Sequence, residues 1–99
     1  MSKALWMPSA LDDLRIIQEF IARDSVYYAK KFVDEAFRAT ERLEIFPESG
    51  RIVPEIGLPT LREIVYGSYR IIYELIQNRV HVVAVIHGKR LLPDTLINS

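Results

Sequence analysis

The sequence contains no cysteine, which excludes disulfide bonds, thiolate metal sites and a cysteine nucleophile. Small secreted domains usually depend on disulfides, so this absence favours a reducing compartment. No apolar run approaches the roughly 20 residues that span a bilayer. The N-terminal stretch Met1–Pro8 also lacks the basic and apolar regions of a signal peptide. We therefore expect a cytoplasmic protein that does not enter the membrane.

Neither sign of charge is in excess, because 13 basic and 13 acidic residues give a net charge of zero. This balance argues against a strongly cationic nucleic-acid-binding protein. Arginine nevertheless dominates the basic residues of the second half of the chain. A guanidinium offers a rigid fork of donors for phosphate or carboxylate, although a single arginine on a strand or loop is more often a solvated surface residue. These arginines are Arg51, Arg62, Arg70, Arg79 and Arg90.

The 99 residues, 49% of them hydrophobic, suffice for one domain that spans residues 1–99 and has its own core. The first half has helical periodicity. A short strand at Lys3–Met7 precedes a helix over Ala10–Ala22, which Ser9 is expected to cap. Asp24–Ser25 is the expected break and the next cap. A second helix of about 20 residues follows, ends before Pro47 and Gly50, and folds back on the first as a hairpin.

After a loop at Gly50–Pro59 the hydrophobic period changes to two, which predicts strands. We expect three of them, at Leu61–Val65, Ser68–Gln77 and Val80–His87. Short connections make the hairpins antiparallel. The predicted fold class is therefore α+β: an N-terminal edge strand and a two-helix hairpin packed on a small antiparallel sheet, in the order β-α-α-β-β-β.

The predicted register of the last hairpin decides which polar residues meet. A turn centred on Asn78–Arg79 places Arg70 opposite His87. The alternating residues Tyr69, Ile71, Tyr73 and Leu75 should then face the helices, whereas Arg70, Ile72, Glu74 and Ile76 should lie on an open face.

The chemistry that this sequence supports is limited. His81 and His87 lie six residues apart on one strand, about 20 Å, and cannot share a metal ion. Nucleophile-elbow, P-loop and dinucleotide motifs are absent, and we expect no cofactor. A group formed by Arg70, His87, Lys89 and Arg90 could bind a phosphodiester, with His87 transferring a proton. Equally, Arg70 could pair with Glu74 or a neighbouring carboxylate, and His87 could be an ordinary strand residue.

Taken together, these segments resemble the RelE/ParE superfamily of bacterial toxins, also known as the plasmid stabilisation family. The resemblance covers essentially the whole chain in order. It rests on four stretches: Leu5-Trp6-x-Pro8-x-Ala10-x-x-Asp13-Leu14-x-x-Ile17; Leu43-x-x-Phe46-Pro47 followed by Gly50-Arg51; Leu61-Arg62-Glu63-Ile64-x-x-Gly67-x-Tyr69-Arg70-Ile71-Ile72-Tyr73; and Val85-Ile86-His87-Gly88-Lys89-Arg90. It implies two helices on a small antiparallel sheet, and a toxin neutralised by a cognate antitoxin.

The resemblance implies one of two activities. RelE-like toxins cleave messenger RNA on the ribosome without a metal, and Arg70 and Arg90 match their arginines, with His87 as the possible acid or base. Leu61, Glu63 and Leu96 stand where that branch carries lysines and a C-terminal tyrosine. A glutamate repels a phosphate, so the departure counts against mRNA cleavage.

ParE-like toxins act on DNA gyrase, and the strands of this chain resemble that branch better. The implied function is therefore a gyrase poison that arrests growth. A ribosome-dependent nuclease is the alternative, and a non-toxic member that only binds its antitoxin is the second. Target contacts are expected from the polar side chains of the strands, namely Arg62, Arg70, His87, Lys89 and Arg90.

An antitoxin has two expected ways to bind. It could add a strand to the edge at Lys3–Met7 or lay an amphipathic helix in a groove beside the helices, with Leu5, Trp6 and Phe20 as candidate contacts. Trp6 is either a core residue or an interface anchor. The protein would then form a homodimer or a toxin–antitoxin hetero-oligomer.

Overall fold

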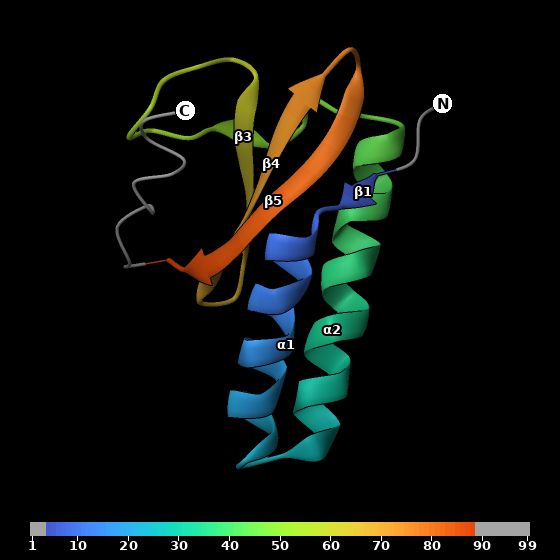
Figure 1. The fold of residues 1–99 in the computed structure, drawn as a ribbon, viewed down its shortest axis with the longest axis vertical. Coiled ribbons are helices and arrows are strands. Elements are labelled where there is room, and N and C mark those ends of the chain that lie inside the picture. The colour runs from blue at the N-terminus through green and yellow to red at the C-terminus, as the bar shows by residue number, and fades with distance from the viewer. Residues whose placement is uncertain (1–3, 89–99) are drawn as a thin grey trace.

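The computed structural model describes residues 4–88, in which two helices pack against one face of a twisted sheet (Figure 1). The predicted α+β class and the two-helix hairpin are confirmed. No helix in this part of the chain is long and apolar enough to cross a bilayer. The elements are β1 (Leu5–Trp6), α1 (Pro8–Ala22), α2 (Val26–Glu41), the short 3₁₀ helix η1 (Arg42–Glu44), β2 (Arg51–Ile52), β3 (Leu61–Tyr66), β4 (Tyr69–Ile76) and β5 (Arg79–His87).

Helix α1 begins earlier than predicted, with Pro8 in its first turn and Met7 at the N-cap position. Proline suits this position because the first helical N–H has no partner within the helix. Ser9 is therefore inside the helix and does not cap it. Its hydroxyl instead donates to the carbonyl of Val83 on β5 at 2.8 Å, so the expected capping role is wrong.

Helix α2 begins as predicted, because the Ser25 side chain accepts a hydrogen bond from the amide of Tyr28 at 3.2 Å. The α1–α2 hairpin buries Ala10, Leu14, Ala29, Phe32 and Ala36 against the sheet. The far end of the hairpin extends beyond the sheet (Figure 1).

The sheet has the strand order β1-β5-β4-β3-β2. β1 lies at one edge, as predicted, and is parallel to β5; the other pairs are antiparallel. Lys3, the first residue of the predicted strand, lies outside the described residues. The loop predicted at Gly50–Pro59 is partly wrong, because Arg51 and Ile52 form β2, which pairs with β3.

The β4–β5 register differs from the prediction. The turn is centred on Gln77–Asn78, both at positive φ (52° and 64°), so Ile76 pairs with Arg79. Two consecutive positive-φ residues are typical of a type I′ hairpin turn. A register shift at Ile72/Tyr73 then moves the pairing back by one residue toward the predicted register. Consequently Arg70 lies opposite Ile86, and Tyr69 rather than Arg70 pairs with His87.

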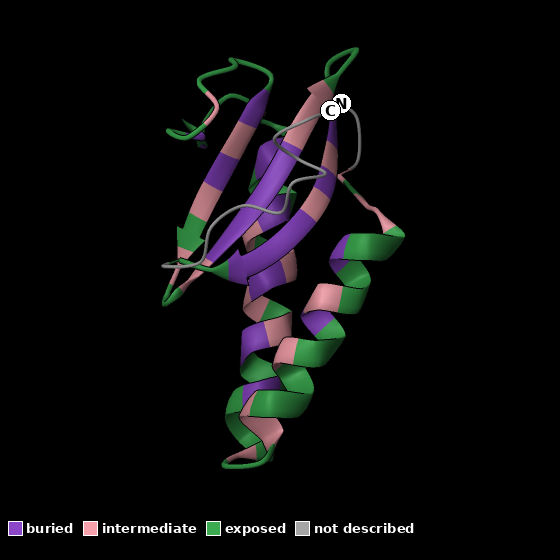
Figure 2. Cartoon of the chain, turned by 60° about the vertical axis from the view of Figure 1, so that its left-hand side comes forward, coloured by how far each residue is buried: buried purple, intermediate pink, exposed green. Residues whose placement is uncertain are grey.

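Two hydrophobic clusters lie on opposite faces of the sheet. The larger packs under the helices and includes Ile71, Tyr73, Val82 and Val85, with Tyr69 and Leu75 partly buried, so the predicted helix-facing set of β4 is confirmed. The second joins Ile72, Ala84 and Ile86 to residues of the loop after β2 and the start of β3, namely Val53, Ile56 and Leu61. The face predicted to be open is therefore closed at its centre, and both central strands are mostly buried (Figure 2).

Candidate functional site

Arg70 lies on the loop-covered face of the sheet and is only 5% exposed. Its Nη1 and Nη2 donate to the two carboxylate oxygens of Glu55 at 2.7 and 2.8 Å, a two-point pairing. Its Nε donates to Glu63 at 2.8 Å, and Nη2 also contacts Glu63. All three guanidinium nitrogens thus bond to carboxylates of this chain, which leaves little of the group for an outside anion.

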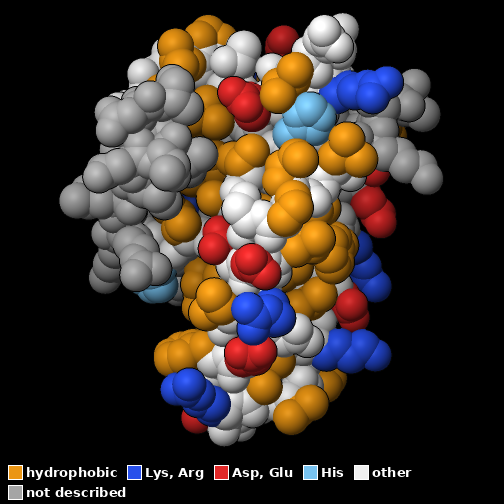
Figure 3. Space-filling view, in the orientation of Figure 1, with side chains coloured by type: hydrophobic (Ala, Val, Ile, Leu, Met, Phe, Trp, Pro, Cys, Tyr) orange, Lys and Arg blue, Asp and Glu red, His pale blue; other side chains and the backbone are white. Residues whose placement is uncertain are grey.

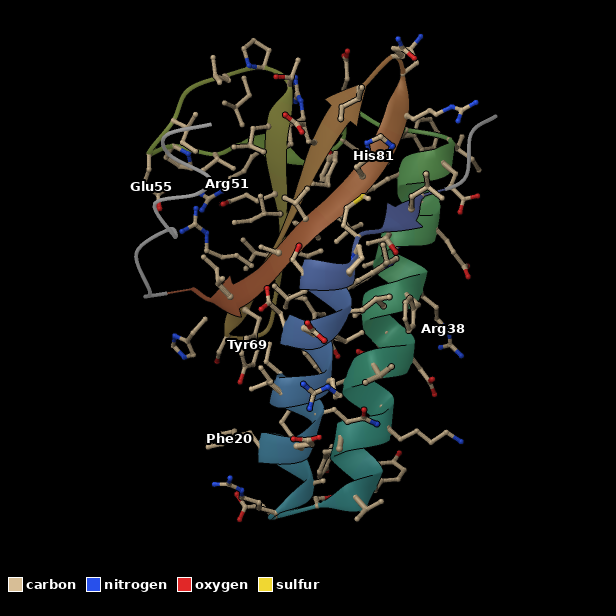
Figure 4. All side chains as sticks on the ribbon, viewed as in Figure 1. Phe20, Arg38, Arg51, Glu55, Tyr69 and His81 are labelled. Carbon is tan, nitrogen blue, oxygen red and sulfur yellow. The ribbon has the colours of Figure 1, made fainter. Side chains whose placement is uncertain are left out.

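Glu63 is the buried centre of this charge cluster, which we define as Arg51, Glu55, Glu63 and Arg70. One Glu63 oxygen accepts from Arg70 and the other from the Nε of Arg51, whose side chain is 60% exposed. Arg51 and Glu55 both lie at the outer side of the sheet in Figure 4. The two arginines balance the two glutamates, and a charged group is rarely buried without such a partner. The Arg70 guanidinium lowers the pKa of the Glu55 carboxyl, and hydrogen bonding to Glu55 raises the pKa of Arg70.

Arg62 points its guanidinium at backbone carbonyls. Its Nε donates to Pro59 O at 2.8 Å, and its Nη1 donates to Glu48 O and Gly50 O at 3.0 Å each. These bonds tie both ends of the 48–59 segment to β3, which indicates that Arg62 serves the fold. The sequence offered no signal for this role.

Tyr73 and Gly50, both in the stretches that carry the family resemblance, contact each other directly. The Tyr73 hydroxyl accepts from Gly50 N at 2.9 Å and donates to Pro47 O at 2.8 Å. A Cβ at Gly50 would lie 2.5 Å from this hydroxyl, so no larger residue fits without a shift. Burial raises the pKa of Tyr73. The signature residues therefore hold the loop on the sheet.

His87 lies on the opposite face from Arg70. It pairs with Tyr69, and its ring meets the Tyr69 ring edge-on, with the centroids 5.6 Å apart. Tyr69 in turn stacks on Phe32 of α2 at 5.1 Å. Because alternate strand residues point to opposite faces, Arg70 and His87 do not share a site, and the predicted pairing across the hairpin is not formed.

An apolar groove of about 350 Å³ lies between α1 and the C-terminal end of β5. Ile16 and Phe20, 56% and 59% exposed, form its helix wall, and Tyr69, Val85 and His87 lie across from them. Figure 4 shows Phe20 projecting from α1 on the side of Tyr69. This α1–β5 groove can receive apolar side chains of a partner.

Trp6 and Leu5 differ in their environment. The Trp6 ring packs edge-on against Phe37 at 4.9 Å, and its indole nitrogen donates to Thr40 at 3.1 Å, so Trp6 joins β1 to α2. Leu5 is 45% exposed. Hydrophobic side chains also gather over the helices on the front of the molecule (Figure 3).

Lys89 and Arg90, two of the predicted target contacts, lie outside the described residues, as does Leu96. Within residues 4–88, no group of three or more potential ligands could hold a metal ion. Two important residues were missed. Glu55 sits in a loop whose path the sequence does not reveal. Glu63 was detectable, because a Gly67–Ser68 turn places it diagonally across from Arg70 on the same face.

Three comparisons relate this chain to known proteins. Residues 4–92 match the sequence model of the ParE toxin of the type II toxin–antitoxin system parDE. Toxin RelE2 of Caulobacter vibrioides is 33% identical over 92 residues, which are 92% of this chain and all of that protein.

The fold is similar to two solved structures. One is the chromosomal ParDE toxin–antitoxin system of P. aeruginosa, with a TM-score of 0.72 and 15% identity over 90% of this chain and 98% of that one. The other is the RelBE2 toxin–antitoxin complex of Mycobacterium tuberculosis, with a TM-score of 0.56 and 18% identity over 87% and 96%. At such identities these likenesses concern the fold alone. The match over most of the sequence and the relative that it covers in full show that the chain belongs to the ParE toxin family of type II toxin–antitoxin systems.

Proposed function

We propose that this protein is a ParE-like toxin that inhibits DNA gyrase, arrests growth and is neutralised by a cognate antitoxin. The observation that carries the proposal is that Arg70 is buried and bonded to carboxylates of its own chain. A metal-free nuclease needs a cation to stabilise the charge that develops on the scissile phosphate. Here the guanidinium of Arg70 is 5% exposed and bonded to two carboxylates.

The surroundings of Arg70 support the same conclusion. Glu63 and Glu55 bring negative charge to the place where a phosphate would have to approach, and like charges repel at short range. His87, the candidate proton donor, faces the other side of the sheet with Tyr69. A toxin that acts by binding a protein needs none of these groups to be free.

The antitoxin is proposed to occupy the α1–β5 groove. Ile16 and Phe20 are one helical turn apart, exposed, and flanked by the aromatic rings of Tyr69 and His87. An amphipathic helix places apolar residues at the same three- and four-residue spacing. Leu5, which is 45% exposed, pairs with His81 nearer the start of β5 and does not line this groove. The two solved structures with a similar fold are a toxin–antitoxin system and a toxin–antitoxin complex, which supports a partner of this kind.

A test starts from expression under a tightly regulated promoter. Growth arrest, relieved by co-expression of the antitoxin, is the expected result. Purified protein should then inhibit gyrase supercoiling and leave ribosome-bound mRNA intact. Cut mRNA with unaffected gyrase would overturn the proposed target, and normal growth at confirmed protein levels would leave only a non-toxic, antitoxin-binding role.

A ribosome-dependent mRNA endonuclease is the second candidate, because the relative at 33% identity is named Toxin RelE2. On this reading Arg70 and Arg90 would bind the mRNA phosphate. Arg90→Ala and His87→Ala are the discriminating variants, since Arg90 matches the second arginine of the RelE-like branch and His87 lies on the face of the sheet opposite Arg70. Loss of mRNA cutting in either, with an unchanged melting temperature, would favour the nuclease.

A further inference from the structure

The two edges of the sheet are protected unequally. On the β5 side, β1 pairs with His81 and Val82, and α1 then covers the next positions with side chains. The Ser9 hydroxyl bonds to Val83 O at 2.8 Å, and the Asp13 carboxylate accepts from Val85 N at 3.0 Å. On the β3 side, β2 pairs only with Arg62 and Glu63.

Hydrogen bonding fixes which β3 groups point outward. Leu75 N donates to Thr60 O at 2.7 Å, so even-numbered residues on this strand bond to β4. Val53 N donates to Leu61 O at 3.1 Å, so odd-numbered residues bond toward β2. The amide and carbonyl of Val65 therefore point outward beyond the end of β2. Within residues 4–88 no backbone hydrogen bond reaches them.

Among the described residues, no lysine, proline or covering element protects this position. Natural sheets shield such edges with lysine, proline or a covering element. Here the exposed strand end is Ile64-Val65-Tyr66, and Val65 is 56% exposed. Between it and the end of α2 lies a hollow of about 400 Å³, which continues the line of β2. The hollow has room for an additional extended strand.

The charges around the hollow select the occupant. Arg42 and Arg51 line it and are exposed, whereas its one acidic lining residue, Glu63, is fully buried and bonded to arginines. Arg51 lies on the loop-covered face, beside Glu63, and Arg42 follows α2 on the helix face. Because strand side chains alternate, acidic residues on either face of an added strand would meet an arginine. We propose that β3 binds, at Val65, an extended acidic segment of a partner protein.

A second copy of this chain fits the edge less well. Antiparallel pairing of β3 with its own copy around Val65 would bring Arg42 and Arg51 of both chains to one short interface, where like charges repel. The proposal concerns a surface that shares no lining residue with the α1–β5 groove, and it does not depend on the choice of gyrase or ribosome as the target.

The test uses isotope-labelled full-length protein and two short blocked peptides. In one, pairs of adjacent glutamates alternate with pairs of valines, so that both faces of the strand carry glutamate; in the other, lysine replaces each glutamate. The glutamate peptide is expected to shift the Val65 amide resonance and slow its hydrogen exchange; the lysine peptide is not. Arg42→Gln and Arg51→Gln should each weaken binding about threefold or more. Arg23→Gln is the matched control, since Arg23 is an exposed cation at the end of α1.

Val65→Pro removes the outward donor while the bonds between β3 and β4 remain, and it should abolish binding. Val65→Glu, which leaves the backbone intact and places a negative charge beside the glutamates of the peptide, should also weaken binding and serves if the proline variant fails to fold. Equal binding of both peptides, shifts confined to the α1–β5 groove, undiminished binding by the Val65 variants, or peptide-free dimerisation through Val65 would each overturn the proposal.

Discussion

The two faces of the sheet use polar and apolar residues in opposite ways. On the loop-covered face, the arginines and glutamates are bonded to one another, and Glu63 and Arg70 are almost completely buried. On the helix face, the α1–β5 groove leaves large apolar side chains such as Ile16 and Phe20 exposed. The buried charges of one face are saturated with internal partners, whereas the groove on the other face offers apolar surface that a partner can cover.

This difference separates the residues that identify the family from those that can bind. Gly50, Arg62, Arg70 and Tyr73 stand in the stretches that resemble the family, and each contacts another part of the same chain. The residues that carry the family resemblance therefore stabilise the fold. Phe20 lies in no such stretch, Ile16 stands at a position that the first stretch leaves unspecified, and nothing inside the fold requires their exposure.

The largest expected effect is the loss of Arg70. Arg70→Ala leaves Glu55 and Glu63 with a missing cation, and removing one partner from a buried ion pair typically costs about 3–5 kcal/mol. Urea denaturation should show a loss of this size in the free energy of unfolding. Arg79→Ala removes an exposed arginine from the hairpin tip and should change it by less than about 0.5 kcal/mol.

A double variant sharpens that result. Glu63→Leu/Arg70→Leu removes both buried charges, so it should be more stable than Arg70→Ala. If Arg70→Ala unfolds as easily as the control, the charge cluster does not stabilise the fold. The loop-covered face would then be as available for ligands as the groove.

The sequence predicted the helices and the three long strands well, because their periodicity follows directly from burial. The β4–β5 register was wrong for a local reason. Asn78 tolerates positive φ and could occupy either position of a two-residue turn. In the structure it takes the second position, and Gln77 takes the first, although glutamine rarely adopts positive φ. The additional shift at Ile72/Tyr73 moves Ala84 and Ile86 to the face opposite Val82. Neither feature has a signal in the apolar pattern, which permits both registers.

For the candidate site, the sequence supported two roles for Arg70 and did not decide between them. Pairing with a neighbouring carboxylate is what the structure has, but the partners are Glu55 and Glu63, whereas Glu74 lies opposite His81. Glu63 follows from a hairpin register, whereas Glu55 depends on how the 53–57 turn folds over the sheet. Such a tertiary contact leaves no local pattern.

The second largest effect concerns Tyr73. Tyr73→Phe removes the acceptor of Gly50 N–H and the donor to Pro47, and a buried group left without its partner costs about 1–3 kcal/mol. Tyr27→Phe, at a 70% exposed position, is the control. Thermal denaturation at neutral pH should separate the two; equal stability would show that the loop is held without this hydroxyl.

The effect of Tyr73→Phe on stability should also depend on pH. Burial raises the pKa of Tyr73 above its ordinary value of 10.0, so the folded state holds the proton more tightly than the unfolded state. The stability that the protonated Tyr73 hydroxyl contributes is complete below pH 10 and is lost as the pH rises through the pKa of the folded state. The difference in stability between wild type and Tyr73→Phe should therefore shrink above pH 10. A constant difference there would contradict this assignment.

An intermediate effect on affinity is expected in the α1–β5 groove. Phe20→Ala should weaken antitoxin binding about tenfold or more, since exposed aromatic anchors often dominate an interface. Stability should change little, because Phe20 is 59% exposed. Val26→Ala, at a 75% exposed position outside the groove, provides the control. Calorimetric titration with the antitoxin would measure both, and equal affinities would remove the groove from the proposed interface.

The smallest expected effect on stability tests whether an ion pair stabilises the fold by itself or only when it is buried. Arg15 bonds to Glu19 at 3.1 Å on α1, yet both side chains are more than half exposed. An exposed pair of this kind typically contributes about 0.3–0.5 kcal/mol and weakens as salt screens it. Arg15→Gln should therefore lower stability by no more than that at low salt and by almost nothing at high salt. Arg70→Ala should keep most of its effect, because water and ions do not reach Glu63. If salt abolished both effects equally, the charge cluster would behave as a surface network, and Arg70 would be open to an outside anion after all.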